Sequence, residues 1–311
     1  MKRAILNIAD TGALESTAHM LERIGYVCMR PGNELLHELR QANLANVLSI
    51  DDLVKDWGYA RPCGPMPAFR EDMQSCDLFV DTKAHTNYPK IVARWPNLAG
   101  KVLWCCLNGG DPTKRTDGEP WADPPCPVLT NNQWYEGPRF YTCYPLYVRF
   151  DERKRSGIDG PPVCLVHNVE RWGHGELVKP LQDEGVMFYG VNSPHCMLPH
   201  AQAMHELEQA TCMVHLKCGD TVGYAVVEAL AAKVPVLCTT RYIEETRLGA
   251  LLEPGKTCLA FHDAPSFRTA MVRVRNAAEN DRIGCWGRER LRDLMWRDAD
   301  GFATFMGRNF K

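Results

Sequence analysis

The sequence lacks any apolar run as long as the roughly 18–20 residues that a membrane-spanning helix needs. The apolar run within Met1–Asp10 is too short for a secretory signal and is expected to form a first strand, so we expect a cytoplasmic protein. Strong charge is also missing, because the formal net charge is −2, and this excludes a basic nucleic-acid-binding character for the whole chain. Internal repeats and low-complexity segments are absent too, which excludes a repeat array.

The sequence contains 14 cysteines but no Cys-x-x-Cys pair. Several cysteines lie inside apolar runs, namely Cys28, Cys105, Cys106, Cys164, Cys212 and Cys238. We expect these to be small buried hydrophobic residues in a reducing compartment, without disulfides. His195, His200 and His205 recur every five residues with Cys196 nearby, a spacing that carries side chains round a helix instead of along one face. We therefore expect no metal site.

Strand and helix signals alternate along the 311 residues, a pattern typical of an α/β protein with parallel sheets. The predicted strands cover residues 3–9, 26–29, 77–81, 101–107, 128–130, 140–148, 163–167, 186–190, 212–216 and 236–239. The first predicted helix follows a turn at Thr11-Gly12 and runs to about Arg23. Further predicted helices cover residues 34–42, 175–182, 201–209, 224–232 and 291–310, and Asn33 is expected to cap the helix at 34–42. Polar loops that follow such strands are the usual ligand sites of open α/β sheets.

The chain is long enough for two domains of ordinary size. A linker is predicted at Asp151–Pro162, which carries charge, glycines and a proline pair. It separates an N-terminal domain at residues 1–150 from a C-terminal domain at residues 163–290. Residues 291–311 form a final amphipathic stretch, and residues 109–127 form a long loop that is either mobile or functional.

The most informative stretch is Cys218–Cys238. Asp220 lies in a glycine-containing loop and Glu228 follows eight residues later, with Gly223 between them permitting close backbone approach. Amides at a helix N-terminus attract phosphate, and carboxylates accept hydrogen bonds from sugar hydroxyls. The stretch therefore indicates recognition of a phosphorylated, hydroxyl-rich ligand. A simpler interpretation also stands, in which Asp220 caps the helix and Glu228 is a solvated helix residue.

The segment from Asp220 to Val236, Asp-Thr-Val-Gly-Tyr-Ala-Val-Val-Glu-Ala-Leu-Ala-Ala-Lys-Val-Pro-Val, resembles the donor-site signature of GT-B glycosyltransferases. It is most similar to the signature of the large retaining family, glycosyltransferase family 4-like, in which seven residues of any type separate two Glu residues. The resemblance implies an α/β protein of GT-B fold, with two Rossmann-like doubly wound domains facing each other across a cleft. The last helix, residues 291–311, would cross back to the N-terminal domain.

The resemblance also implies an activity and roles for the residues of the motif. The protein would move a hexosyl or related group from a nucleotide-sugar to an acceptor hydroxyl with retention, using no metal and no cofactor besides this co-substrate. Asp220 would be catalytic and contact the hydroxyls of the transferred sugar, while Glu228 would hold the ribose. The amides of Gly223 and Tyr224 would face the diphosphate. Asp220 is one methylene shorter than the family's Glu, which leaves the sugar open.

Four residues in three loops of the N-terminal half match loops that face the ligand in this family. Gly12 lies in a loop that resembles the family's first glycine-containing loop, which packs toward the donor phosphates. His85 follows one predicted strand, and Asn108 and Asp111 follow the next. The family often places a His in one of these two loops to touch the sugar or the acceptor, and the second loop offers Asn108 instead of His. Satisfied loop residues are the alternative interpretation of His85 and Asp111.

The family's phosphate-binding Arg and Lys are missing after the first strand of the C-terminal half, where Asn168 occupies the Arg position. Arg171 or Lys217 would have to replace them, because departure of the diphosphate needs a positive or donor-rich partner. The absence of this Arg and Lys indicates either altered phosphate binding or a domain that has lost catalysis.

The sequence leaves the acceptor and the oligomeric state open. A glycan, a lipid-linked sugar or a small molecule is the usual acceptor for the family. The Arg153–Arg155 patch and scattered Trp residues would also suit a phage-type enzyme that modifies hydroxymethylated DNA bases. A non-catalytic nucleotide-sugar-binding protein and a sugar-nucleotide epimerase are the alternatives outside transfer.

Overall fold

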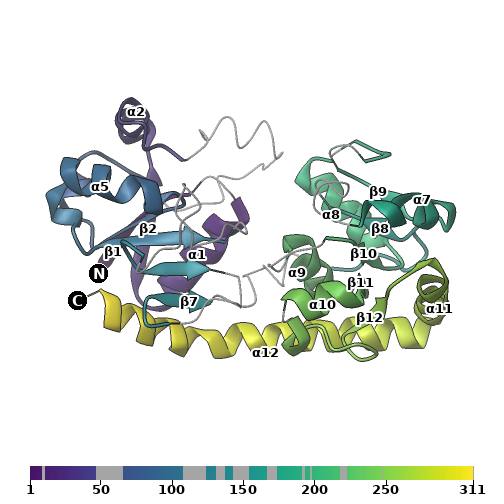
Figure 1. The fold of residues 1–311 in the computed structure, drawn as a ribbon. Coiled ribbons are helices and arrows are strands. Elements are labelled where there is room, and N and C mark those ends of the chain that lie inside the picture. Colours follow the sequence, from purple (N-terminus) through teal and green to yellow (C-terminus); the bar gives the residue numbers. More distant parts are fainter. Residues whose placement is uncertain are drawn as a thin grey trace. The chain divides into compact units, whose positions relative to one another are not determined.

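The computed structural model describes residues 1–8, 11–46, 66–107, 124–130, 137–142, 154–166, 174–190, 193–196, 198–217, 223–246 and 248–310. The chain forms two compact units. The N-terminal unit contains mainly Met1–Tyr147 together with Arg297–Lys311, and the C-terminal unit contains mainly Val148–Trp296. Each unit is a parallel sheet with its own helices (Figure 1).

The sheet of the N-terminal unit has seven parallel strands in the order β3-β2-β1-β4-β5-β6-β7. These strands are β1 (Lys2–Asn7), β2 (Tyr26–Pro31), β3 (Met66–Ala68), β4 (Leu78–Asp81), β5 (Val102–Cys106), β6 (Val128–Thr130) and β7 (Phe140–Thr142). The helices are α1 (Thr11–Arg23), α2 (Asn33–Gln41), α4 (Asp72–Ser75), α5 (Ala84–Arg94) and the 3-10 helix η1 (Pro96–Leu98). Strands β4 and β5 are buried at every position, as central strands of a parallel sheet covered on both faces should be.

The sheet of the C-terminal unit has five parallel strands in the order β12-β11-β10-β8-β9. These are β8 (Val163–Cys164), β9 (Met187–Phe188), β10 (Met213–His215), β11 (Val236–Thr239) and β12 (Cys258–Phe261). The helices are α7 (Gly175–Asp183), α8 (His200–Gln209), α9 (Tyr224–Ala231), α10 (Thr240–Thr246), the 3-10 helix η3 (Leu248–Ala250), α11 (Ala264–Arg275) and α12 (Ala277–Asn309).

Both sheets are doubly wound, because the strand order reverses within each. The reversal lies between β1 and β4 in the N-terminal unit and between β8 and β10 in the C-terminal unit. In open α/β sheets, ligands bind outside the carboxyl ends of the strands at this point. The strand ends there carry polar residues, Asn7 on β1, Asp81 on β4 and His215 on β10. Each unit therefore has one edge suited to a ligand.

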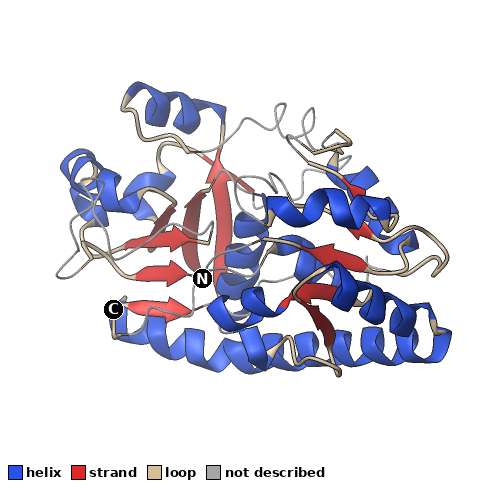
Figure 2. Cartoon of the chain, turned by 45° about the vertical axis from the view of Figure 1, so that its right-hand side comes forward, coloured by secondary structure: helices blue, strands red, loops and turns tan. Residues whose placement is uncertain are grey.

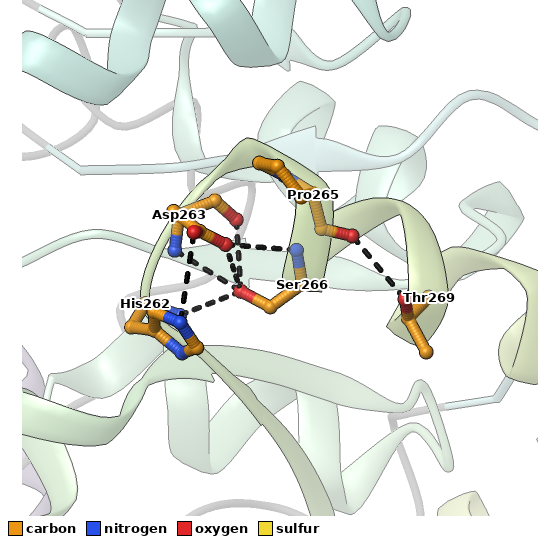
Figure 3. A network of polar contacts seen from close by, with 5 residues as sticks. All are labelled: His262, Asp263, Pro265, Ser266 and Thr269. Carbon is orange, nitrogen blue, oxygen red and sulfur yellow. Dashed lines mark hydrogen bonds and ion pairs between the residues drawn. The ribbon is translucent and has the colours of Figure 1, made fainter.

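Helix α11 begins with a capping box that also fixes the end of β12 (Figure 3). The Asp263 carboxylate accepts a hydrogen bond from the Ser266 amide at 2.8 Å, and the Ser266 hydroxyl accepts one from the Asp263 amide at 3.1 Å. These bonds satisfy amides that a helix N-terminus leaves without partners. The helix then packs Phe267 against Phe261 of β12, with ring centroids 5.3 Å apart, in the core of the C-terminal unit.

Helix α12 is an unbroken helix of 33 residues (Figure 2). Its residues up to Trp296 belong to the C-terminal unit, and those from Arg297 on belong to the N-terminal unit. Small residues let its first part approach the C-terminal unit closely, since a β-carbon at Gly284 would lie 2.1 Å from the carbonyl oxygen of Lys233. In its last part, Phe302 and Phe305 pack on Tyr141 of β7, with centroids at 5.2 and 5.4 Å.

Several sequence-based expectations are confirmed and a few are corrected. The predicted strands at residues 128–130 and 236–239 coincide with β6 and β11, and the fold class is α/β with two parallel sheets. The prediction that Asn33 caps α2 is wrong, because Gly32 occupies the N-cap position and makes no side-chain bond. The final helix is longer than predicted and begins at Ala277. Among the described residues, no helix combines the length and the apolar character that crossing a membrane requires.

Candidate functional site

The first turn of α9 lies at the carboxyl edge of the C-terminal sheet, where β10 leads toward it. Gly223 is the N-cap residue, with extended φ and ψ of −71° and 138°, and Tyr224 is the first helical residue. The Ala-, Val- and Leu-rich sequence favours a helix, and residues 226–231 are buried. The first turn contains no acidic residue that would neutralise the positive end of the helix dipole. Its amides are therefore suited to an anion.

Position 223 requires glycine because the ring of His215 packs closely beneath it. A β-carbon at this position would stand 2.9 Å from Cε1 of His215, the last residue of β10. The Gly223 amide donates a hydrogen bond of 3.3 Å to the hydroxyl of Tyr242, and the Tyr242 ring packs on His215 with centroids 4.5 Å apart. Close packing, and not a left-handed backbone, accounts for this glycine.

His215 is buried, and neither ring nitrogen has a hydrogen-bond partner within the described part of the chain. Burial lowers its pKa to about 3, with the nearby Lys217 charge adding to the effect. The ring is therefore neutral at physiological pH. A buried imidazole without partners is unfavourable, because each unsatisfied polar atom loses its hydration without replacement.

Glu228 lies in the second turn of α9 and is buried, with 9% of its surface exposed. The Nε2 atom of His200, the first residue of α8, lies 2.8 Å from Oε1 of Glu228. A carboxylate accepts, so the imidazole donates this hydrogen bond. The interpretation of Glu228 as a solvated helix residue is wrong, since its carboxylate is held inside the C-terminal unit.

A third histidine lies at the same edge of the sheet. His174, the N-cap residue of α7, has its Nδ1 atom 3.0 Å from Oε1 of Glu176 and its Nε2 atom 3.4 Å from the Thr239 hydroxyl. The same hydroxyl accepts a hydrogen bond of 3.2 Å from the Tyr242 amide. The predicted site residues do not include His174, His200 or His215. The sequence signal that could have identified them is a His at the end of a strand or at the start of a helix.

The carboxyl edge of the N-terminal sheet carries a buried carboxylate, Asp81, at the end of β4. Its oxygens accept hydrogen bonds from Nδ2 of Asn7 at 2.7 Å, Nδ2 of Asn46 at 3.0 Å and the Lys83 amide at 2.6 Å. Nδ2 of Asn87 contributes longer bonds of 3.3 and 3.4 Å. Burial raises the pKa of Asp81 to about 6, although these donors act in the opposite direction. The network ties four segments of the unit together at this edge.

His85 follows this network as the second residue of α5. Its ring packs on Trp104 of β5, with centroids 4.7 Å apart, and Nδ1 is buried without a hydrogen-bond partner in the described residues. Burial lowers the pKa of His85, and the charge of Lys83 contributes. The ring is therefore held in a fixed place beside the switch point of the N-terminal sheet.

The remaining predicted site residues have different outcomes. Gly12 is the second residue of α1, and Lys217 follows β10 and is half-buried. Four predicted residues lie outside the described residues: Asn108, Asp111, Arg171 and Asp220. Gly223, Tyr224, Glu228 and Lys217 thus share the sheet edge of the C-terminal unit, while Gly12 and His85 belong to the N-terminal unit. Among the described residues, no three His, Cys, Asp or Glu side chains are grouped so as to hold a metal ion.

The predicted basic patch at Arg153–Arg155 is corrected at Arg155. Its guanidinium points into the C-terminal unit and donates hydrogen bonds to the carbonyl oxygens of Gly157, Lys233, Ala210 and Thr211 and to Oδ1 of Asn280. Lys154 is exposed, and Arg153 lies outside the described residues. Arg155 is therefore an anchor of the C-terminal unit, with its guanidinium donors engaged by these five acceptors.

The structure resembles solved glycosyltransferases over almost its whole length. A glycosyltransferase from Rickettsia africae has a TM-score of 0.63 at 11% identity, covering 99% of this chain and 98% of that one. HepE from Anabaena, in complex with UDP and glucose, has a TM-score of 0.57 at 12% identity, covering 99% of both chains. Sucrose-phosphate synthase from Thermosynechococcus elongatus has a TM-score of 0.56 at 14% identity, covering 99% of this chain and 98% of that one.

No protein-family model matches the sequence, and no curated protein matches it either. Identities of 11–14% show a shared fold. The chain has two parallel, doubly wound sheets with their helices, and this is the architecture that its sequence predicts. The chain therefore has the GT-B fold of these glycosyltransferases.

Proposed function

We propose that the protein is a glycosyltransferase that moves a sugar from a nucleotide-sugar to an acceptor hydroxyl. The observation that carries the proposal is the start of α9, where Gly223 and Tyr224 open a helix without first-turn acids and Glu228 lies buried one turn further on. Amides for a diphosphate and a carboxylate for hydroxyls are thus combined on one helix. The GT-B fold supports the proposal, because the same fold occurs in the glycosyltransferases named above.

A UDP-hexose is the donor that we propose first. HepE has been solved in complex with UDP-glucose and with UDP and glucose, and it shares the fold over the length of this chain. In our proposal the Gly223 and Tyr224 amides bind the diphosphate, the Gly223 N–H exchanging its bond to the Tyr242 hydroxyl for one to a phosphate oxygen, and Glu228 binds the ribose. By the family resemblance, Asp220 orients the sugar and Arg171 or Lys217 stabilises the departing phosphate.

The proposed reaction breaks the bond between the anomeric carbon and the diphosphate oxygen. A bond forms between that carbon and the acceptor oxygen, the acceptor's hydroxyl proton is lost and the nucleoside diphosphate departs. We propose retention at the anomeric carbon from the resemblance of the motif. The protein's contribution is positioning together with stabilisation of the leaving phosphate.

The acceptor side is proposed to be the switch-point edge of the N-terminal sheet. By the family resemblance, His85 and Asp111 would touch the sugar or the acceptor, Gly12 and Asn108 would contact the donor, and the Asp81 network would hold the segment that leads to His85. A hydroxyl-bearing glycan or small molecule is the acceptor that we favour. The DNA-modifying alternative is weakened, because Arg155 of its expected basic patch is engaged inside the protein.

Thermal unfolding in the presence of UDP, ADP, GDP and their glucose conjugates tests the proposal. A ligand present at 100 times its dissociation constant should stabilise the native state by about 2.7 kcal/mol, a shift of several degrees. The shift should be lost in Glu228→Ala and kept in Glu244→Ala, which removes an exposed carboxylate from α10 of the same unit. Stabilisation by none of these ligands would refute the proposed donor site.

A further inference from the structure

His200 and Glu228 form a largely buried pair that joins two helices. Nε2 of His200 lies 2.8 Å from Oε1 of Glu228, and the side chains are 19% and 11% exposed. The residues are 28 positions apart, at the start of α8 and in the second turn of α9. The contact therefore depends on tertiary packing and not on local sequence.

Glu228 stands in unusually apolar surroundings for a carboxylate. Its neighbours Val226, Val227, Ala229 and Leu230 are all buried and make α9 an otherwise hydrophobic helix. A buried ion pair stabilises a fold no better than well-packed apolar side chains of similar volume. A carboxylate kept at this place is therefore explained better by a ligand than by stability of the helix.

The direction of the carboxylate follows from helix geometry. Side chains on a helix tilt toward its N-terminus, so Glu228 leans toward the turn that begins at Gly223 and Tyr224. One helical turn rises about 5.4 Å, and this is roughly the axial separation between Glu228 and the start of α9, where the amides proposed to bind the diphosphate lie. In a nucleoside diphosphate the ribose directly follows the phosphates and would meet this carboxylate.

We infer that His200 is a positioning residue that fixes the Glu228 carboxylate so that it selects ribose over 2′-deoxyribose in the nucleotide. The inference rests on the proposed function and adds the means of its selectivity. The imidazole engages Oε1 and thereby restricts the rotation of a flexible side chain. A carboxylate with a fixed orientation can accept hydrogen bonds from the neighbouring ribose hydroxyls, and an analogue that lacks one hydroxyl loses one of these bonds.

The test measures dissociation constants of UDP and 2′-deoxy-UDP by calorimetry, or of the ADP or GDP pair if thermal unfolding selects that base. The wild type should prefer the ribonucleotide by about tenfold or more, the effect expected for one hydrogen bond to a charged group. His200→Ala should lose most of this preference. His200→Gln should retain part of it, because its amide N–H can still donate to the carboxylate.

His205→Ala is the matched control, since His205 lies on the same helix, is exposed and contacts Gln209 instead of the site. It should keep the wild-type preference. Wild-type protein that binds no nucleotide would refute the proposed function and this inference with it. Nucleotide binding with equal affinity for both sugars, or full preference in His200→Ala, would overturn the inference and leave the donor site standing. If His200→Ala does not fold, the preference for UDP over 2′-deoxy-UDP is measured in His200→Gln, with Glu228→Gln as the reference for a lost preference. A preference between those of Glu228→Gln and the wild type would support the inference, and the full wild-type preference would overturn it.

Discussion

Gly223 and His215 are in direct contact, because the α-carbon of Gly223 lies where any β-carbon would stand 2.9 Å from Cε1 of His215. Tyr242 joins them from a third element, with its hydroxyl on the Gly223 amide and its ring on the imidazole. The end of β10, the start of α9 and the start of α10 are thus packed as one group. Changes in this group should affect ligand binding and stability together.

Gly223→Ala should displace the first turn of α9, because the buried imidazole beneath it has little room to move. Overpacking of this kind costs about 1–3 kcal/mol of stability. The affinity for UDP should fall as well, since the amides move. Gly249→Ala is the control, because a β-carbon at Gly249 meets nothing within 4 Å.

The double variant Gly223→Ala/His215→Ala extends this test. Removing the imidazole makes room for the new methyl group, so the effects of the two changes on stability should not add. Thermal unfolding of the four proteins measures the coupling. Strictly additive effects would show that His215 does not dictate the glycine.

His215 should make the C-terminal unit sensitive to acid. Its pKa is lowered to about 3 in the folded protein, while an unfolded chain has the ordinary value near 6.5. Between these values the unfolded state binds a proton that the native state does not, so stability falls as the pH falls from about 6.5 toward 3. The full effect would reach about 5 kcal/mol at 1.36 kcal/mol for each pH unit.

His215→Leu removes the titrating group and both unpaired nitrogens while keeping a similar volume. At pH 7 its stability should lie within about 1.5 kcal/mol of the wild type. Its unfolding temperature should fall less steeply than that of the wild type between pH 6.5 and 4. Parallel curves for the two proteins would show that the imidazole is not held neutral in the native state.

Much of the architecture could be predicted from local sequence. The β11 strand is an apolar run that follows Pro235, and it is buried at every position. The α9 helix was placed correctly by its Ala-, Val- and Leu-rich sequence. By contrast, β3 is a strand of only three residues, Met66–Ala68, and contains a proline, so local pattern gives almost no signal for it.

The contacts of the candidate site could not be predicted in the same way. Glu228 was singled out from its spacing, but its partner His200 is brought to it by packing of α8 on α9. Asp81 and Asn7 are 74 residues apart and meet only because β1 and β4 are neighbours in the sheet. Sequence periodicity indicates which residues are buried, and the fold decides which polar residues meet.

Asp81 should give the N-terminal unit a pH dependence of the opposite sign. Its pKa is about 6 in the folded protein and near 3.9 in an unfolded chain, so the native state holds a proton that the unfolded state loses. The stability from this group is present below about pH 4 and is lost as the pH rises through 6. The loss would reach about 3 kcal/mol.

Asp81→Asn removes this titration, and its unfolding temperature relative to the wild type should therefore rise between pH 4 and 6. The variant should still be less stable at low pH, because its amide would face the donors of Asn7, Asn46 and Lys83. Glu34→Gln, an exposed change in α2, should leave the wild-type profile unaltered. A difference between Asp81→Asn and the wild type that stays constant with pH would contradict the raised pKa.

Arg155→Ala should destabilise the C-terminal unit much more than the adjacent change Lys154→Ala. Arg155 satisfies carbonyl oxygens on three separate segments, and its loss removes this partner from those of Ala210 and Lys233, while that of Thr211 keeps a bond of 3.0 Å from Nδ2 of Asn280. Unsatisfied buried acceptors cost about 1–3 kcal/mol each, so we expect a loss of at least about 2 kcal/mol. Arg155→Lys should recover only part, because an ammonium cannot reproduce the planar fork of five donors. Equal thermal stability of Arg155→Ala and Lys154→Ala would instead mean that Arg155 is a surface charge, and the basic patch would again be available to a polyanion.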